Sequence, residues 1–154
     1  MIEIVSLSSE HIQQVHTIEL ASQPDPWSLS LLQSCLSPRY INFVAVENAQ
    51  VLGFLIADWI AGEACLMNIC TAPQHRAKGI AQVLHQYFVS ELHLRNTEKL
   101  WLEVRASNFA AQSLYKKLGY KRIAVRKNYY AATATSVVED AIIMQIEPLT
   151  NHHI

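Results

Sequence analysis

Residues 66–104 carry the pattern that most restricts the fold of this 154-residue chain. A short apolar strand over 66–71 leads through a basic loop into a helical pattern over 79–95, and a second apolar strand follows over 100–104. One face of the predicted helix is apolar at the spacing of an amphipathic helix, with Ile80, Val83, Leu84, Tyr87, Phe88 and Leu92. A helix that crosses between two strands of one sheet joins them in parallel, so this segment predicts a parallel pair.

The segments on either side predict a mixed sheet. A weakly alternating strand, two helices and a hairpin precede the crossover, and a helix and two strands follow it. The predicted strands are 2–7, 41–46, 51–60, 122–127 and 140–146, and the predicted helices begin at Ser8-Ser9, at Ser28 and at Ser107 or Asn108. Ile12, Val15, Ile18 and Leu20 form the apolar stripe of the first helix, and Gly119 ends the last one. The fold class is therefore α/β, in two or three layers.

Length and charge exclude several classes of protein. The chain suits one domain, with 51% apolar and 16% charged residues, which is typical of a globular protein. A net charge of -1 argues against a broad nucleic-acid-binding face. No apolar run reaches the roughly 18 to 20 residues of a membrane span, and residues 1–4 lack the basic start of a signal peptide. We therefore expect a cytoplasmic protein that contacts neither membrane nor nucleic acid directly.

The cysteines do not indicate a metal or redox site. Cys35, Cys65 and Cys70 lie in apolar stretches, form no CxxC pair and are odd in number. The seven histidines show no metal-ligand spacing. We expect buried reduced thiols and no bound metal.

The loop before the central helix is a candidate anion site. Arg76, Lys78 and Gly79 stand together where a strand passes into a helix, a geometry that aims unpaired N–H groups at an anion. The chain has neither the GxxxxGK[ST] loop of nucleoside-triphosphate sites nor the GxGxxG loop of dinucleotide sites. On spacing alone, a solvent-exposed basic helix start remains the simpler alternative.

Longer motifs resemble one family. "RAKGIA" over 76–81 resembles the Q/R-x-x-G-x-G/A motif of the Gcn5-related N-acetyltransferase (GNAT) family. The second half is similar at "LWLEVRASNFAAQSLYKKLGY", "RKNYY" and "EDAIIM", as is "PWS" near the start. The resemblance implies one domain over 1–147 with a short tail over 148–154. It also implies a mostly antiparallel mixed sheet with helices on both faces and a central parallel pair splayed to hold acetyl-CoA.

The resemblance assigns residues to acetyl-CoA. The segment that wraps the pyrophosphate is Ala77, Lys78, Gly79, Ile80, Ala81 and Gln82. Ile69, Cys70 and Thr71 offer main-chain groups to the pantetheine arm, and Asn108 both caps its helix and bonds to the arm. Ala81 stands where the family more often has a second glycine, which leaves less room for the phosphate.

Acetyl transfer to an amine needs a base for the ammonium proton and an acid for the leaving thiolate. Glu103 lies in an apolar strand; taken alone, it is a strand-end carboxylate that pairs with Arg105 or faces water. The resemblance makes Glu103 the general base. Tyr115, at helical spacing with Ala111 and Leu118, is by pattern a core tyrosine. The resemblance makes Tyr115 the general acid.

The acceptor side is the least regular part of the match. By resemblance, Trp27, Tyr129 and Tyr130 border a peptide channel, although large aromatic residues are as often simple packing residues. Asp25 replaces a bulky apolar residue of the family, and "AATATS" over 131–136 replaces its proline-and-Asp-Gly turn. Both changes lie on the acceptor side and leave the predicted catalytic residues unchanged.

Within the family, the chain resembles bacterial enzymes that acetylate the N-terminal alanine of small-subunit ribosomal protein eighteen. The expected partner is therefore the N-terminal peptide of a ribosomal protein, and nothing in the sequence requires more than a monomer. One alternative is an acetyltransferase for other N-termini or for a small amine. Another is a non-catalytic acetyl-CoA-binding module, which would need neither Glu103 nor Tyr115.

Overall fold

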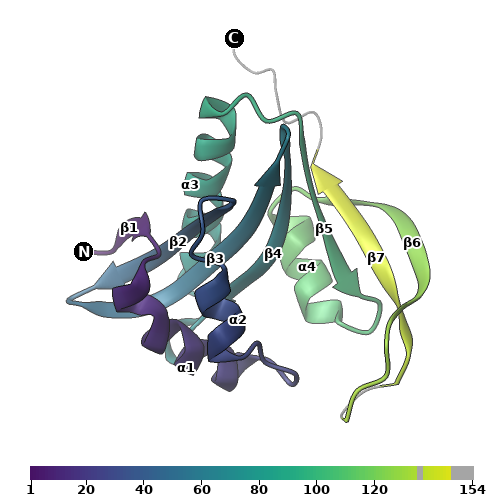
Figure 1. Cartoon of the computed structure of the whole chain (residues 1–154), viewed down its shortest axis with the longest axis horizontal. Helices are drawn as coiled ribbons and strands as arrows, with labels where there is room; N and C mark the ends of the chain where they lie inside the picture. The colour runs from purple at the N-terminus through teal and green to yellow at the C-terminus, as the bar shows by residue number, and fades with distance from the viewer. Residues whose placement is uncertain (135–136, 147–154) are drawn as a thin grey trace.

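The structure, a computed structural model, describes residues 1–134 and 137–146. In those ranges seven strands form one sheet in the order β1-β2-β3-β4-β5-β7-β6 (Figure 1). The strands are β1 Glu3–Ser6, β2 Tyr40–Glu47, β3 Gln50–Ile60, β4 Glu63–Thr71, β5 Lys99–Arg105, β6 Lys121–Tyr130 and β7 Glu139–Ile146. The α-helices of the same ranges are α1 Ile12–Ser22, α2 Leu29–Ser34, α3 Ile80–Leu94 and α4 Phe109–Lys117, with 3-10 turns at Ser9–His11 and Pro73–His75. The predicted order of elements is confirmed, and the predicted tail over 148–154 lies outside the described residues.

The central strands β4 and β5 are parallel, as predicted, while every other neighbouring pair is antiparallel. Their pairing is short and runs only from Glu63 opposite Lys99 to Cys65 opposite Trp101. Strand β4 stays paired with β3 as far as Thr71. Beyond Cys65 the two parallel strands diverge, which leaves one edge of β4 open in the middle of the sheet (Figure 1).

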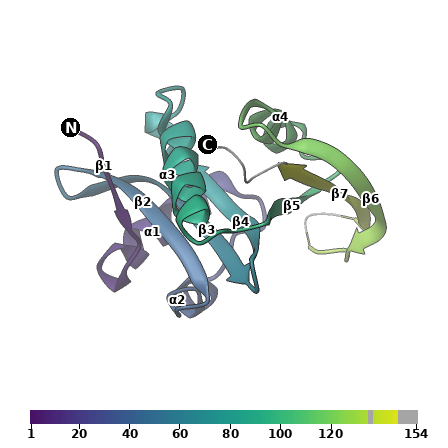
Figure 2. The same cartoon turned by 90° about the horizontal axis from the view of Figure 1, so that it is seen from above.

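Helices cover both faces of the sheet, as the resemblance implied (Figure 2). On one face α3 packs Leu84 and Phe88 against Leu55 and Leu102, and α4 lies beside it. On the other face α1 and α2 form a second core with alternate residues of β2 and β3; its members include Val15, Ile18, Leu32, Val44, Phe54 and Ile56. Alternate side chains of β3 thus enter opposite cores, because successive residues of a strand point to opposite faces. In the part of the chain that the structure describes, no helix is both long and apolar enough to span a membrane.

Two predicted helix faces need correction. In α1 the buried positions are Ile12, Val15, Ile18 and Glu19, whereas Leu20 is 55% exposed. In α3 the buried positions are Ile80, Leu84, His85, Phe88 and Leu92, whereas Val83 and Tyr87 are 38% and 51% exposed. The i, i+3, i+4 geometry selects Glu19 and His85 although both are polar, so helical geometry overrides hydropathy at these two places.

Side-chain caps fix two of the helix starts. The Leu31 N–H donates to Ser28 Oγ at 3.1 Å, and the Ala111 N–H donates to Asn108 Oδ1 at 3.1 Å. Asn108, rather than Ser107, is therefore the cap of α4. Gly119 follows α4 with a φ of +107°, a conformation that favours glycine at a helix end.

His85 of α3 forms a buried polar pair with Tyr120, which follows α4. Its Nε2 lies 2.9 Å from Tyr120 Oη, and both side chains are almost fully buried. Burial lowers the pKa of His85 to about 4, so the imidazole is neutral at physiological pH. A neutral imidazole can accept a hydrogen bond from the Tyr120 hydroxyl, so both buried groups have a partner.

This pair makes stability depend on pH. Since the folded pKa lies below the unfolded value of 6.5, the unfolded chain takes up a proton first as pH falls, and stability declines between pH 6.5 and about 4. The His85 contribution amounts to about 2 kcal/mol between roughly pH 7.5 and 5. We expect His85→Gln, which can still accept the Tyr120 hydroxyl, to remove this part of the pH dependence. Urea unfolding at both pH values measures the free energy of unfolding. If the variant lost as much stability between the two pH values as the wild type, His85 would not be the group responsible.

Candidate active site

One cavity of about 960 Å³ opens where β4 and β5 diverge. Its walls come from the end of α1 and the loop after it, from β4 and β5, from the start of α3, and from α4. The predicted site residues that line it are Ile69, Cys70, Thr71, Ala77, Gly79, Ile80, Ala81, Gln82, Glu103, Asn108 and Tyr115. Segments from residues 69 to 115 thus meet around one space.

The loop before α3 has the geometry of an anion cradle. Ala77 and Gly79 both have left-handed φ values, +63° and +77°. Among the described residues, the N–H groups from Ala77 to Gln82 donate to no protein acceptor. A Cβ added at Gly79 would meet no atom within 4 Å, so the glycine faces open space. Unpaired N–H groups at a helix start, next to open space, suit a phosphate.

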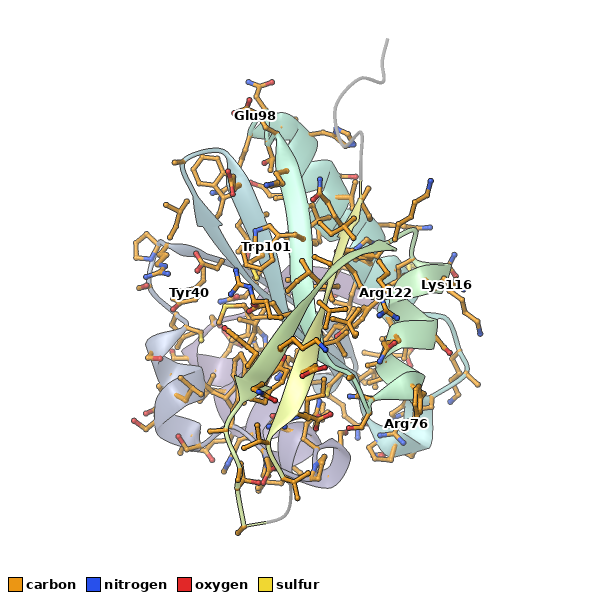
Figure 3. The ribbon with its side chains drawn as sticks, turned by 90° about the vertical axis from the view of Figure 1, so that its right-hand side faces the viewer. Tyr40, Arg76, Glu98, Trp101, Lys116 and Arg122 are labelled. Carbon is orange, nitrogen blue, oxygen red and sulfur yellow. The ribbon has the colours of Figure 1, made fainter. Side chains whose placement is uncertain are left out.

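The two cations of this loop have different partners. Arg76 lines the cavity, and its Nη2 donates to Ser22 Oγ at 3.4 Å. Figure 3 labels the Arg76 side chain. Lys78 is not among the lining residues, and its Nζ lies 3.5 Å from His75 Nδ1. The structure therefore places Arg76, and not the Lys78 side chain, beside the space at the cradle.

The open edge of β4 forms the second wall. Cys70 Sγ accepts a hydrogen bond from Gln23 Nε2 at 3.3 Å. Burial, followed by the nearby Glu19 carboxylate, raises the pKa of Cys70 to about 11, so this thiol stays protonated at neutral pH. In residues 1–134 and 137–146, no group of three or more His, Cys, Asp or Glu side chains is placed to hold a metal ion.

Glu103 is held by two side chains of β6. Tyr129 Oη donates to its Oε1 at 3.1 Å, and Arg126 Nη1 forms an ion pair with its Oε2 at 3.0 Å. Despite that ion pair, Oε2 is buried and receives no hydrogen bond from the described residues. The alternative in which Glu103 pairs with Arg105 is wrong, because Arg105 instead contacts Glu139.

Tyr115 lies on α4 and lines the cavity. Its ring packs edge-on against Tyr120 at a centroid distance of 5.9 Å. Burial, with smaller contributions from Cys70 and Tyr130, raises the pKa of Tyr115 well above its ordinary value. The phenol therefore carries its proton at neutral pH and can donate it into the cavity.

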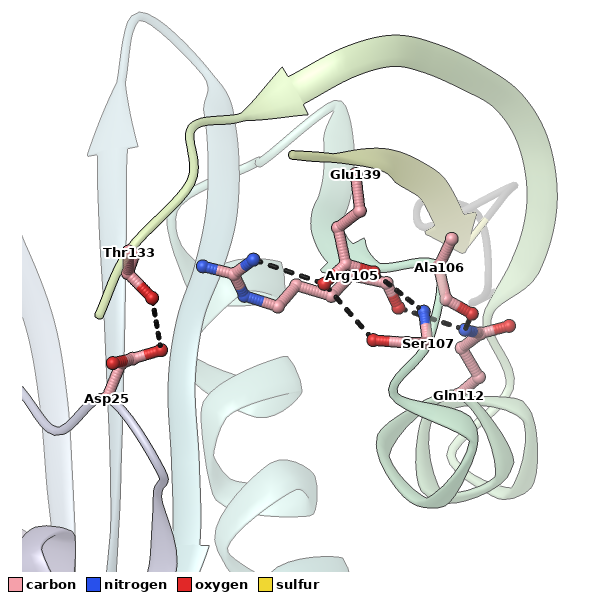
Figure 4. Close-up of polar contacts among 7 residues, drawn as sticks. All are labelled: Asp25, Arg105, Ala106, Ser107, Gln112, Thr133 and Glu139. Atoms are coloured by element: carbon pink, nitrogen blue, oxygen red, sulfur yellow. Dashed lines mark hydrogen bonds and ion pairs between the residues drawn. The ribbon is translucent and has the colours of Figure 1, made fainter. Parts of the chain in front are cut away.

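A polar cluster joins the end of β5, the start of α4 and the start of β7 (Figure 4). Glu139 accepts from the Ser107 hydroxyl at 3.1 Å, from the Ser107 N–H at 3.0 Å and from Arg105 at 3.2 Å. The Ser107 hydroxyl, with the Ser107 N–H and Arg105, lowers the pKa of Glu139. Gln112 Nε2 donates to the carbonyls of Arg105 and Ala106 at 3.1 and 3.0 Å. These bonds fix the start of α4 relative to β5.

The predicted acceptor side lies between the α1–α2 loop and β6. Trp27 and Tyr130 line the cavity, while Tyr129 contacts Glu103. The two segments that depart from the family pattern touch: Thr133 Oγ1 donates to Asp25 Oδ2 at 3.4 Å (Figure 4). Residues 135–136 of the second segment lie outside the described residues.

Sequence reasoning missed one cavity residue with an unusual environment. Glu19 is only 1% exposed and accepts from the Trp27 N–H and from Asn68 Nδ2, both at 2.9 Å. The available signal was its position, one residue after Ile18 and four after Val15 on the buried face of α1.

Comparisons with known proteins agree with this geometry. The Acetyltransferase (GNAT) family matches residues 9–120. The [Ribosomal protein bS18]-alanine N-acetyltransferase of Escherichia coli K12 is 37% identical over 143 residues, which cover 93% of this chain and 95% of that protein. The Haemophilus influenzae protein of the same name is 34% identical over 86% of this chain and 89% of its own length. The crystal structure of the E. coli enzyme superposes with a TM-score of 0.85 over 95% of this chain and 93% of that one.

Proposed function

The chain belongs to the acetyltransferase (GNAT) family, and we propose that it transfers acetyl from acetyl-CoA to the N-terminal alanine of ribosomal protein bS18. Support for the acceptor comes from relatives named [ribosomal protein bS18]-alanine N-acetyltransferase, which are 34% to 37% identical over most of the chain. A ribosomal acceptor implies work in the cytoplasm. The observation that supports the reaction is one cavity lined by an anion cradle, a carboxylate and a partly buried phenol.

Acetyl-CoA fits the two open walls. Its pyrophosphate would lie against the unpaired N–H groups from Ala77 to Gln82, with Arg76 as the added cation. Its pantetheine arm would follow the open edge of β4 at Ile69, Cys70 and Thr71, with Asn108 opposite. Bound there, acetyl-CoA supplies the thioester carbon that the acceptor amine attacks.

Two side chains then handle the protons. A free α-amine has a pKa of about 8, so it arrives largely as an ammonium at neutral pH. Glu103 would take a proton and release the nucleophilic amine. As the amine bonds to the acetyl carbon and the C–S bond breaks, Tyr115 would give its proton to the thiolate. The second proton of the attacking nitrogen leaves as the amide forms and would return to the Tyr115 phenolate, while the proton taken by Glu103 passes to solvent. Because the Cys70 thiol stays protonated, we favour direct transfer over an acetyl-cysteine intermediate.

Gly79→Val tests the cradle. Valine at a φ of +77° is strained, and its branches would enter the open space where we place the pyrophosphate. We expect the acetyl-CoA dissociation constant to rise about 10-fold or more, since hydrogen bonds to a charged group are lost. Isothermal calorimetry on the folded variant measures it.

Gly62→Val is the matched control, because Gly62 has a φ of +83° in the turn before β4 and does not line the cavity. It should show comparable backbone strain with normal acetyl-CoA affinity. If both variants bound acetyl-CoA normally, the loop would be an ordinary solvent-exposed helix start.

A peptide panel tests the function as a whole. Labelled acetyl-CoA is supplied with peptides that carry the bS18 N-terminus, the same peptide with serine or methionine first, an N-blocked lysine peptide, and spermidine. We expect fastest labelling of the alanine-first peptide, at its α-amine by mass spectrometry. Preference for the lysine side chain or spermidine would reassign the acceptor, and no labelling of any amine would reject the transferase proposal.

A further inference from the structure

Glu19 is a buried carboxylate that the proposed chemistry does not use. It lies on α1, lines the cavity and is 1% exposed. Among the described residues it forms no ion pair with a cation. A buried charge without a counter-ion is costly unless several hydrogen bonds stabilise it, so the bonds that Glu19 accepts need an explanation.

Those bonds join two walls of the cavity. Oε2 accepts the main-chain N–H of Trp27, in the loop between α1 and α2, at 2.9 Å. Oε1 accepts Asn68 Nδ2, from the open part of β4, at 2.9 Å, and the Cys70 thiol lies 3.9 Å from the same oxygen. One carboxylate therefore ties the Trp27 loop to the strand edge along which we place the thioester arm.

The Trp27 loop borders the half of the cavity that contains Glu103. Two residues before Trp27, Asp25 contacts Thr133 in the connection between β6 and β7. Strand β6 also carries Tyr129, which contacts Glu103. The Trp27 loop and the connection between β6 and β7 therefore touch on the Glu103 side of the cavity, whereas the cradle lies at the start of α3.

We propose that Glu19 is a positioning residue for the acceptor: it fixes the Trp27 main chain against β4 and so sets the place where the acceptor amine enters. This inference rests on the proposed transferase function. A fixed wall lets the acceptor bind in the geometry that reaction needs, which lowers its KM. Acetyl-CoA affinity should depend little on Glu19, because the cradle does not contact it and because Glu19 bonds to side chains of β4, whereas we place the arm on main-chain groups of that strand.

Two substitutions separate hydrogen bonding from charge. Glu19→Leu keeps approximate volume but leaves the Trp27 N–H and the Asn68 amide unpaired. Glu19→Gln can still accept the Trp27 N–H, and its own amide can donate to Asn68 once the Asn68 amide turns over. We therefore expect Glu19→Leu to be impaired and Glu19→Gln to remain close to the wild type.

Gln14→Leu is the matched control. Gln14 lies on the same helix, accepts from the Val51 N–H at 2.8 Å and donates to the Ala49 carbonyl at 3.3 Å. Gln14 does not line the cavity. Loss of these two hydrogen bonds should loosen α1 to a similar degree without moving the Trp27 loop.

Steady-state kinetics provide the first test. For Glu19→Leu we expect the peptide KM to rise about 10-fold, with the acetyl-CoA dissociation constant within about 2-fold of wild type. Glu19→Gln and Gln14→Leu should change the peptide KM less than about 3-fold. A normal peptide KM in folded Glu19→Leu, or an equal rise in Gln14→Leu, would overturn the proposal.

Amide hydrogen exchange at Trp27 provides the second test and needs no variant to fold. In the wild type this N–H should exchange more slowly than its loop neighbours, because it donates to a buried carboxylate. Fast exchange would overturn the proposal.

The two proposals are tested by different quantities. The wild-type rate on the peptide panel tests the transferase function by itself. The ratio of the variant KM to the wild-type KM, measured on the best acceptor of that panel, tests Glu19.

Discussion

Glu103→Gln is expected to lower kcat/KM by about 100-fold or more near pH 7, with acetyl-CoA affinity almost unchanged. The amide keeps the size of the side chain and can still accept the Tyr129 hydroxyl, but it cannot take a proton from the acceptor. The deficit should shrink as pH rises through about 8, because free amine then forms without a base. A pH–rate series on wild type and variant measures both effects.

Arg126→Gln is the control for this experiment, because Glu103→Gln also removes the ion pair with Arg126. Arg126→Gln breaks the same pair but keeps the carboxylate, and its side chain is 54% exposed, so we expect a loss of only a few-fold. If instead the Glu103→Gln deficit stayed constant from about pH 6.5 to 9.5, Glu103 would position the acceptor and not remove its proton.

Most of the fold follows from local patterns in the sequence, but the start of β4 does not. The order of strands and helices is read from periodicity and turn residues, and it is confirmed. The predicted strand 66–71 omitted Glu63, Ala64 and Cys65, although these are the β4 residues that pair in parallel with β5. Glu63, Ala64 and Cys65 follow a glycine and show no alternation of apolar and polar residues. Their strand conformation comes from pairing with the neighbouring strands.

The contacts of the candidate site follow less well from the sequence. The motif around Glu103 suggested a partner two residues away, Arg105, which lies on the same face of the strand. In the fold, β6 comes back beside β7, and its residues Arg126 and Tyr129 reach Glu103 instead. Such a contact depends on strand order across the sheet, which local patterns do not encode.

Glu19 illustrates the same limit at a helix. A stripe chosen by hydropathy included Leu20 and passed over Glu19, yet Leu20 is exposed and Glu19 is buried. The partners that make burial tolerable, Trp27 and Asn68, come from a loop and a strand. Sequence reasoning finds polar residues in cores poorly for this reason: their partners are distant along the chain.

Tyr115→Phe is expected to lower the rate of transfer about 10-fold or more, which is within the range for a lost general acid. The substitution removes one hydroxyl and almost no volume, so packing against Tyr120 should persist and stability should change modestly. Because burial keeps the phenol protonated far above neutral pH, the deficit should stay level across the range in which the Glu103→Gln deficit shrinks. The two pH profiles therefore assign acid and base independently.

Tyr120→Phe is the matched control for Tyr115→Phe. Tyr120 packs against Tyr115 but does not line the cavity, and its hydroxyl contacts His85. Removing that hydroxyl should lower stability, since it leaves a buried imidazole nitrogen unpaired, while turnover stays near normal. Equal losses of turnover in both variants would mean that the tyrosine pair only supports α4. Normal turnover in Tyr115→Phe would make Tyr115 a packing residue, and the thiolate would then have to leave without a protein acid.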